Sequence, residues 1–288
     1  MPSNYTDKNT AGVLYVTATP IGNMDDISIR AREILSSVDY IAAEDTRETG
    51  KLLADLGIKS KLISYHEHNE DKRSAELIRK LQDGCSIALV SDAGTPCVSD
   101  PGYRIVHDAA VCGLSVVPIP GPSAAVAALS ASGLPTDMFA FLGFAPKKDG
   151  KRISWLTGVR DFPGTLIFYE SAKRLLSMLR DILDVLGNRD AVIAREITKK
   201  YETFIRGNVQ HLINKFEEEG DPKGEITILV SGKPVSEVVS DDMAIAEITK
   251  LLKEGNSLST AVKTVSGMMS LPRKKIYDLA LSIKNEVE

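Results

Sequence analysis

The sequence predicts an α/β fold: two α/β domains followed by a small C-terminal helical extension. Two observations indicate this architecture. Short β-rich runs alternate with helical runs over most of the chain, and the pattern of its last part is helical throughout. A length of 288 residues exceeds one typical domain, and 43% hydrophobic residues are ordinary for packed cores. We therefore expect an N-terminal α/β domain at 1–132, a second α/β domain at 133–235 and the extension at 236–288.

The N-terminal domain is predicted to contain a largely parallel sheet, because alternating strands and helices form βαβ units with helices on the sheet faces. The expected strands are 13–16, 40–43, 87–90 and 115–117, and the expected helices are 29–35, 51–56, 105–111 and 124–129. The order of the strands stays open. Gly133 and Pro135 predict a hinge at 133–137, because both residues interrupt helix and strand.

The second domain shows a similar alternation and is predicted to form another α/β layer. Its expected strands are 139–142, 165–168, 191–194 and 225–230, and its expected helices are 171–186 and 210–218. Apolar residues in 175–186 recur at helical spacing, and Gly187 predicts the end of that helix. We interpret this helix as facing the core.

The C-terminal extension is predicted to consist of three short helices, at 243–252, 258–265 and 274–283. Basic residues begin the last of them, namely Arg273, Lys274 and Lys275. The arrangement is similar to a helix-turn-helix, in which such a helix end commonly contacts nucleic acid. A purely structural cap is the alternative.

The loop 91–102 is the strongest indication of a ligand site. It directly follows the apolar run 87–90, and it carries Asp92 and Asp100 among glycines and prolines. Polar groups placed this way lie at the carboxyl edge of a sheet, where open α/β folds bind ligands. Two loops of similar construction follow other strands, at 19–23 and 118–123.

Composition limits the possible partners. The net charge of −4, from 35 basic and 39 acidic residues, argues against a protein that coats nucleic acid through bulk positive charge. Contacts to RNA would be local, at the basic runs 147–152, 199–200 and 273–275, and a solvated surface is the alternative for each run.

The chain is expected to be cytoplasmic and free of membrane attachment and metal. No apolar run approaches the roughly 20 residues of a membrane span, and the polar start at 1–4 lacks the order of a secretion signal. The cysteines, at positions 85, 97 and 112, show no ligand spacing, so neither a disulfide framework nor a zinc site is expected. His66 and His68 lack a visible third ligand.

Several enzyme motifs are absent. The chain has no G-x-G-x-x-G after its first strand, no G-x-x-x-x-G-K-[ST] and no G-x-S-x-G, so the usual dinucleotide, triphosphate and α/β-hydrolase sites are not indicated. The common methyltransferase pattern of an acidic residue followed by alternating glycines is missing as well.

Several segments agree in order and spacing with one family. These segments are 14–23, 42–47, 68–70, 91–96, 100–102, 120–122, 166–171 and 194–196. Through them nearly the whole chain resembles the bacterial ribosomal RNA small subunit methyltransferase I family, a group of ribose 2′-O-methyltransferases in the tetrapyrrole methylase superfamily. The resemblance implies two α/β domains of the tetrapyrrole methylase type, with S-adenosylmethionine in a cleft between them. It also implies a cytidine in the decoding region of 16S rRNA as acceptor, and a homodimer.

The resemblance also assigns cofactor-binding residues. They are Ile21, Gly22, Gly94, Thr95, Val98, Ser123, Ala124, Tyr169, Ala194 and Glu225. S-adenosylmethionine carries no phosphate, which fits Gly- and Pro-rich loops without lysine. Without the resemblance, Ser123 would be interpreted as a plain helix N-cap.

A ribose hydroxyl is a poor acid and benefits from a nearby proton acceptor. The candidates are Asp92, Asp45 and Asp100, of which Asp92 is preferred because its loop also faces the cofactor. Each has a structural alternative: Asp92 and Asp100 as caps in a tight loop, and Asp45 as the partner of Arg47.

The remaining candidates concern RNA. Phosphate contacts are expected from Arg47, Lys147, Lys148 and Arg152, with Arg273, Lys274 and Lys275 as a remote anchor. Tyr65 and Tyr103 are candidates for stacking on a splayed base, with packing as the alternative.

Two other functions stay open at this point. A methyltransferase for tetrapyrroles or for the diphthine precursor on elongation factor would share the fold, and a non-catalytic RNA-binding protein would share it without the cofactor. The C-terminal extension and the loop 43–47 favour the RNA methyltransferase.

Overall fold

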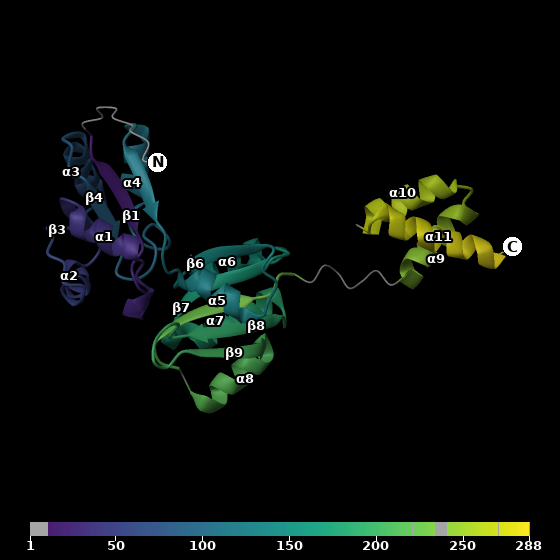
Figure 1. Cartoon of the computed structure of the whole chain (residues 1–288). Coiled ribbons are helices and arrows are strands. Elements are labelled where there is room, and N and C mark those ends of the chain that lie inside the picture. Colours follow the sequence, from purple (N-terminus) through teal and green to yellow (C-terminus); the bar gives the residue numbers. More distant parts are fainter. Residues whose placement is uncertain (1–10, 221, 234–240, 270, 288) are drawn as a thin grey trace. The chain divides into compact units, whose positions relative to one another are not determined.

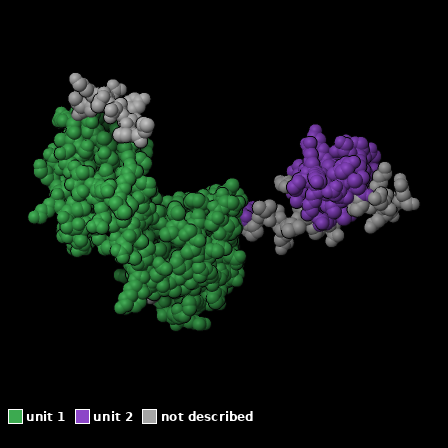
Figure 2. Space-filling model, in the orientation of Figure 1, with its two compact units in different colours: residues 1–232 green, residues 233–288 purple. Residues whose placement is uncertain are grey.

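The computed structural model describes residues 11–220, 222–233, 241–269 and 271–287. They belong to two compact units, 1–232 and 233–288 (Figure 2). The predicted boundary at 235/236 and the polar start at 1–4 lie outside the described residues.

The first sheet of unit 1 is entirely parallel, as predicted, with the order β3-β2-β4-β1-β5. Figure 1 shows β1, β3 and β4 of this sheet together with the helices α1 to α4. Its strands are β1 (Val13–Thr17), β2 (Tyr40–Ala43), β3 (Leu62–Ser64), β4 (Ile87–Val90) and β5 (Ser115–Ile119). Its helices are η1 (Met24–Asp26), α1 (Ile29–Ser37), α2 (Thr46–Asp55), α3 (Glu70–Gln82), α4 (Tyr103–Val111) and α5 (Ala124–Ser132). Strand β3 and helix α3 were not predicted, and β3 has only three residues at the sheet edge.

The continuous apolar run of β4 is explained by burial on both faces of this sheet. Ile87 and Leu89 belong to one core cluster with α3 and α4, whereas Ala88 and Val90 belong to another with α1 and α2. The chain leaves the neighbouring strands β1 and β4 in opposite directions across the sheet. From β1 it continues to β2, on the side of β4, whereas from β4 it continues to β5, on the side of β1. Loops that leave the carboxyl ends of β1 and β4 therefore diverge around a crevice, where open α/β sheets bind ligands.

The second sheet is mixed and has the order β6-β7-β10-β8-β9. Its strands are β6 (Phe139–Phe144), β7 (Thr165–Ser171), β8 (Asp190–Arg195), β9 (Thr203–Asn208) and β10 (Glu225–Val230). Its helices are α6 (Asp149–Gly158), η2 (Ala172–Arg174), α7 (Leu175–Leu186) and α8 (Val209–Glu219). Only β6 and β7 pair in parallel, and the unpredicted strand β9 forms an antiparallel edge.

Helix α5 joins the two halves of unit 1, of which the first half contains the parallel sheet and the second half the mixed sheet. It falls within the predicted first domain, yet Ala125, Ala128 and Leu129 pack against Ile167 and Leu229 of the second sheet. The opposite face of that sheet is covered by α6, α7 and α8, and α7 faces its core as expected. The small alanines of α5 let it lie close to the strands. A hydrogen bond from the Ala125 N–H to the Tyr169 hydroxyl fixes its N-terminus against β7.

The regular elements in the described part of unit 2 are all helices, as predicted: α9 (Asp241–Lys253), α10 (Leu258–Met269) and α11 (Arg273–Val287). Its core contains Ala244, Ile248, Val262, Val265, Ile276 and Ala280. The hydroxyl of Ser266 donates to the Leu271 carbonyl at 2.7 Å and so links the end of α10 to the residues before α11. In the described part of the chain, no helix combines the length and apolar character needed to cross a membrane.

Candidate functional site

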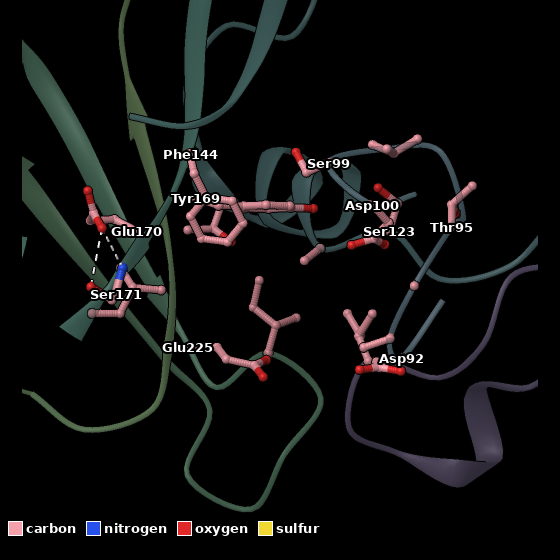
Figure 3. Close-up of a pocket in the computed structure, with 18 of the residues that line it drawn as sticks. Asp92, Thr95, Ser99, Asp100, Ser123, Phe144, Tyr169, Glu170, Ser171 and Glu225 are labelled. Carbon is pink, nitrogen blue, oxygen red and sulfur yellow. Dashed lines mark hydrogen bonds between the residues drawn. The ribbon is translucent and has the colours of Figure 1, made fainter. Parts of the chain in front are cut away.

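Unit 1 contains a pocket of about 470 Å³ between loops of its two sheets (Figure 3). The first half contributes Ile21, Glu44, Asp92, Ala93, Gly94, Thr95, Val98, Ser99, Asp100, Ser123 and Ala124. The second half contributes Phe144, Tyr169, Glu170, Ser171, Ile197, Gly224, Glu225, Ile226 and Thr227. Five of these side chains are carboxylates and none is a lysine or arginine.

The loop after β4 is held in place by hydrogen bonds to the loops after β1 and β5. The Thr19 N–H donates to the Gly94 carbonyl at 2.8 Å, and the Gly94 N–H donates back to Thr19 at 3.1 Å. The Thr95 hydroxyl donates to the Pro122 carbonyl at 3.0 Å, which links the loops after β4 and β5. Three loops at one sheet edge thus form a preorganised wall.

Backbone conformation supports this wall as a functional element. Gly94 has φ +85°, and a Cβ there would lie 3.3 Å from the side chain of Ile21. Cys97 and Ser99 also have positive φ, at 69° and 67°, which costs free energy in residues with side chains. Such strain is retained where the surrounding structure requires it.

Tyr169 connects the second sheet to the N-terminus of α5. Its hydroxyl accepts the Ala125 N–H at 3.2 Å, and its ring packs edge-on against Phe141 and Phe144, with centroid distances of 4.7 and 5.6 Å. Ser123 stands at the N-cap position but makes no side-chain cap hydrogen bond. The Ser123 side chain is therefore not engaged as a cap and lines the pocket instead.

Three pocket carboxylates of the first half have raised proton affinity. Burial raises the pKa of Glu44, and the negative charges of Asp100 and Asp92 raise it further. Burial also raises the pKa values of Asp92 and Asp100. Asp92 Oδ1 accepts the Asp45 N–H at 2.9 Å. A carboxylate with a raised pKa binds a proton more readily, so all three of these carboxylates are suited to accept a proton.

Asp45 is arranged differently and lies outside the pocket lining. It caps α2 by accepting the Arg47 N–H at 2.8 Å, and its two oxygens also accept from the Arg47 guanidinium. These hydrogen bonds hold the pKa of Asp45 well below its usual range. The contacts match the structural alternative for Asp45, and we remove it from the proton acceptors.

Two predicted cofactor residues also do not line the pocket, Gly22 and Ala194. At Gly22, a Cβ would lie 2.4 Å from Lys199, so this glycine permits a close approach of the loop 196–199. Ala194 is fully buried beneath the pocket and pairs with Thr227, which does line it. The other predicted cofactor residues line the pocket: Ile21, Gly94, Thr95, Val98, Ser123, Ala124, Tyr169 and Glu225.

Sequence reasoning missed most of the lining from the second half. Glu170 is 2% exposed, its Oε1 accepts the Ser171 N–H at 2.7 Å, and its Oε2 lies 3.1 Å from Arg174. Gly224 to Thr227 reach the pocket because β10 begins where the antiparallel β7 ends, with Glu225 opposite Ser171. Figure 3 shows Glu170 and Ser171 on one side and Asp92, Thr95 and Asp100 on the other. Glu44 could have been predicted as a pocket residue, since it directly follows strand β2.

Lys199 does not line the pocket but forms ion pairs with Glu225, which does, and with Glu196. Its ammonium lies 3.0 Å from both Glu196 and Glu225. Burial lowers the pKa of Lys199, but the bonds to Glu225 and Glu196 outweigh burial and raise it overall. Lys199 is therefore neutralised locally and is a poor candidate for a phosphate contact.

The structure corrects two of the predicted RNA contacts. Arg152 is 4% exposed, and its guanidinium bonds to Asp181 and lies 3.1 Å from Asp149, so it faces the core of α6 and α7 instead of solvent. Tyr65 is 1% exposed and bonds to Ser74, so it is unavailable for base stacking.

The other predicted RNA contacts are accessible to different degrees. Lys147, Lys148, Arg273 and Lys274 are exposed, and so are Arg47, despite its pairing with Asp45, and Tyr103. Lys275 is half-buried and pairs with Asp241 at 2.9 Å. Within the described ranges, no three His, Cys, Asp or Glu side chains are grouped to hold a metal ion.

Comparison with known proteins defines the class to which this fold and pocket belong. The family model "Tetrapyrrole (Corrin/Porphyrin) Methylases" matches residues 13–213. Among solved structures, uroporphyrin-III C-methyltransferase from Thermus thermophilus complexed with S-adenosyl homocysteine has a TM-score of 0.54 at 17% identity, covering 76% of this chain and 97% of that one. A diphthine synthase has a TM-score of 0.58 at 14% identity, covering 76% and 90%. These structures share the fold.

Curated relatives are much more similar in sequence, and each is named ribosomal RNA small subunit methyltransferase I. The protein from Vibrio cholerae is 45% identical over 98% of both chains. The protein from Halalkalibacterium halodurans is 43% identical over 96% of this chain and 97% of its own, and that from Micromonospora olivasterospora is 42% identical over 94% and 87%. The chain therefore belongs to the tetrapyrrole methylase family and, within it, to the ribosomal RNA small subunit methyltransferase I group.

Proposed function

We propose that this protein uses S-adenosylmethionine to methylate the ribose 2′-hydroxyl of a cytidine in the decoding region of 16S rRNA. The supporting observation is the pocket of about 470 Å³, with five carboxylates, no cationic side chain and a wall of preorganised loops, in a chain whose relatives are named for rRNA methylation. S-adenosylmethionine supplies an electrophilic methyl group on a positively charged sulfur.

The residues of the pocket suit such a ligand. No lysine or arginine lines the pocket to repel the sulfonium. Glu170 and Glu225 are paired with Arg174 and Lys199, so the carboxylates of the first half, Glu44, Asp92 and Asp100, are the ones that offset its charge. Thr95, Ser123 and the loop backbones offer neutral donors and acceptors for a ligand without phosphate. Tyr169 fixes the N-terminus of α5 beside them, and N–H groups of a helix start favour an anionic group such as a carboxylate.

Asp92 is the proton acceptor that we assign to the ribose hydroxyl, with Asp100 and Glu44 as the other two candidates. Asp92 uses one oxygen to accept the Asp45 N–H, which orients the carboxylate and leaves the second oxygen for substrate. Its raised pKa increases the driving force for taking a proton while the methyl group transfers in line.

A transfer assay tests this function. Purified protein is incubated with radiolabelled S-adenosylmethionine and small ribosomal subunits from a strain lacking the enzyme, with a porphyrinoid and unmodified elongation factor as parallel acceptors. Label in the ribose of one 16S rRNA cytidine is expected. Label only in the porphyrinoid or the elongation factor would assign the alternative methyltransferases, and no affinity for the methyl donor in calorimetry would leave a non-catalytic RNA-binding protein.

Cellular location and assembly belong to the same proposal. An rRNA acceptor places the activity in the bacterial cytoplasm. The homodimer implied by the family resemblance predicts about twice the chain mass of 31.2 kDa in light scattering.

A further inference from the structure

Unit 2 has a hollow of its own, of about 360 Å³, between α10 and α11. It is lined by Ser259, Val262, Lys263, Arg273, Lys274 and Tyr277, and we call it the α10–α11 pocket. The first three residues lie at i, i+3 and i+4 on one face of α10, and the others lie in the first turns of α11. Core contacts of Val262 and Ile276 hold the two helices together at this point.

The charge of the α10–α11 pocket is entirely positive. Lys263, Arg273 and Lys274 line it without any carboxylate, and none of the three forms an ion pair with another described residue. Two other lysines of unit 2 differ: Lys275 pairs with Asp241 at 2.9 Å and Lys250 with Glu247 at 3.1 Å. The first N–H groups of the 15-residue helix α11 have no intrahelical acceptors and add to the attraction for an anion.

An aromatic ring accompanies these cations. Tyr277 is 46% exposed, although its neighbour Ile276 is fully buried. Val262 is 6% exposed and gives the hollow an apolar floor. An accessible aromatic face next to converging cations is the combination by which proteins bind single-stranded nucleic acid, because the ring stacks on a base while the cations contact the backbone.

We propose that the α10–α11 pocket binds one unpaired nucleotide of RNA. Lys263, Arg273 and Lys274 contact its phosphate, and its base stacks on Tyr277. An acidic peptide would meet the cations but would leave the exposed ring without a partner, so the observations favour RNA. This inference goes beyond the proposed methyl transfer, on which it rests only for the source of the RNA, since nucleotide binding here requires no methyl donor.

Full-length protein and a fluorescein-labelled single-stranded oligoribonucleotide test the proposal by fluorescence anisotropy. Tyr277→Ala is expected to weaken binding about tenfold, a typical loss for one stacked base, whereas Tyr277→Phe keeps the ring and the affinity. Lys263→Ala is expected to weaken binding and to reduce the slope of log K against log salt by about 0.7. Lys250→Ala removes the same charge outside the pocket and is expected to bind within about twofold of wild type.

A fluorescence measurement places the base directly. The chain has a single tryptophan, Trp155, which packs against Phe168 in unit 1. Tyr277→Trp in a Trp155→Phe background puts the only indole in the pocket, and a stacked base is expected to quench its emission as anisotropy rises.

Three results would overturn the proposal. They are unaltered affinity in both Tyr277→Ala and Lys263→Ala, unchanged indole emission while RNA binds, and displacement of RNA by poly-glutamate at equal charge concentration, which would indicate a peptide site. Affinity for S-adenosylmethionine, measured by calorimetry on the same variants, is expected to stay unchanged. Failure of nucleotide binding is thereby distinguished from failure of the proposed methyl transfer.

Discussion

Asp92 has two properties that a neutral side chain can separate, a hydrogen bond to the backbone and a raised pKa. Its Oδ1 accepts the Asp45 N–H at 2.9 Å, and burial raises its pKa. The hydrogen bond needs only an oxygen, which asparagine also has, whereas proton acceptance needs the carboxylate. The substitution Asp92→Asn therefore removes the proposed chemistry and leaves the local geometry in place.

Asp92→Asn is expected to lower kcat for methyl transfer about a hundredfold or more, with little change in affinity for the methyl donor. It should also raise the Tm at pH 7. A carboxylate whose folded pKa is raised destabilises the folded protein as pH rises above the unfolded value of about 3.9, and asparagine lacks this penalty. The gain should vanish near pH 3, where aspartate is protonated in both states. Wild-type kcat in this variant would exclude Asp92 as the acceptor and leave Asp100 and Glu44.

Gly94 offers a second test at the residue scale, with a matched control. Gly94 and Gly57 both have positive φ, at +85° and +70°, but a Cβ at Gly57 meets nothing within 4 Å. Gly94→Trp is expected to abolish binding of S-adenosylmethionine by filling the pocket, while Gly57→Trp, with a similar backbone penalty of about 1–2 kcal/mol, should bind normally in calorimetry. Normal binding by a folded Gly94→Trp variant would contradict the site.

At the scale of elements, α6 shows how one basic run can divide between surface and core. Lys147 and Lys148 precede the helix and are exposed, whereas Arg152, one turn in, is buried against Asp181. A helix places residues of a short segment on different faces, so adjacent charges need not share a role. The sequence indicated a basic run, and the packing of α6 on α7 decided which members reach solvent.

Arg152→Ala is expected to lower the free energy of unfolding by about 3 kcal/mol, because it leaves Asp181 without its partner in a largely buried position. The double substitution Lys147→Ala and Lys148→Ala should leave stability within about 0.5 kcal/mol and weaken binding to small subunits. Urea unfolding measures the first effect and subunit binding the second. A stability loss below about 0.5 kcal/mol for Arg152→Ala would show that its ion pair contributes little.

At the scale of the whole molecule, the two units carry separable sites. Residues lining the unit 1 pocket fall between Ile21 and Thr227, and those lining the α10–α11 pocket fall between Ser259 and Tyr277. Each unit also has its own core, with α5 holding the two sheets of unit 1 together.

A fragment of residues 1–232 is therefore expected to bind S-adenosylmethionine within about twofold of the full chain, because no lining residue is lost. The fragment should bind small subunits more weakly and methylate them at a higher KM, since it lacks the α10–α11 pocket. Calorimetry and the transfer assay measure the two effects. A folded fragment without donor affinity would show that unit 2 contributes to the first pocket.

The sequence by itself determined the parallel sheet, the helical extension and the half of the pocket that follows β1, β4 and β5. Parallel strands end at one sheet edge, so the loops after the apolar runs, such as the one that carries Asp92, must gather there. The individual cofactor residues in these loops, such as Thr95, were assigned through the family resemblance. That inference needs only the positions of the strands along the chain.

Tertiary structure decided most of the other half, of which only Tyr169 and Glu225 were assigned beforehand, through the family resemblance. Glu170 and Glu225 lie far apart in sequence and reach one pocket because β7 and β10 pair antiparallel, with Ser171 opposite Glu225. Pairing direction depends on which strands become neighbours, and the order β6-β7-β10-β8-β9 is not contained in the local pattern of any one strand. Packing also buried Arg152 on α6 and, in the core of the first sheet, Tyr65, since burial is a property of neighbours that a local pattern does not contain.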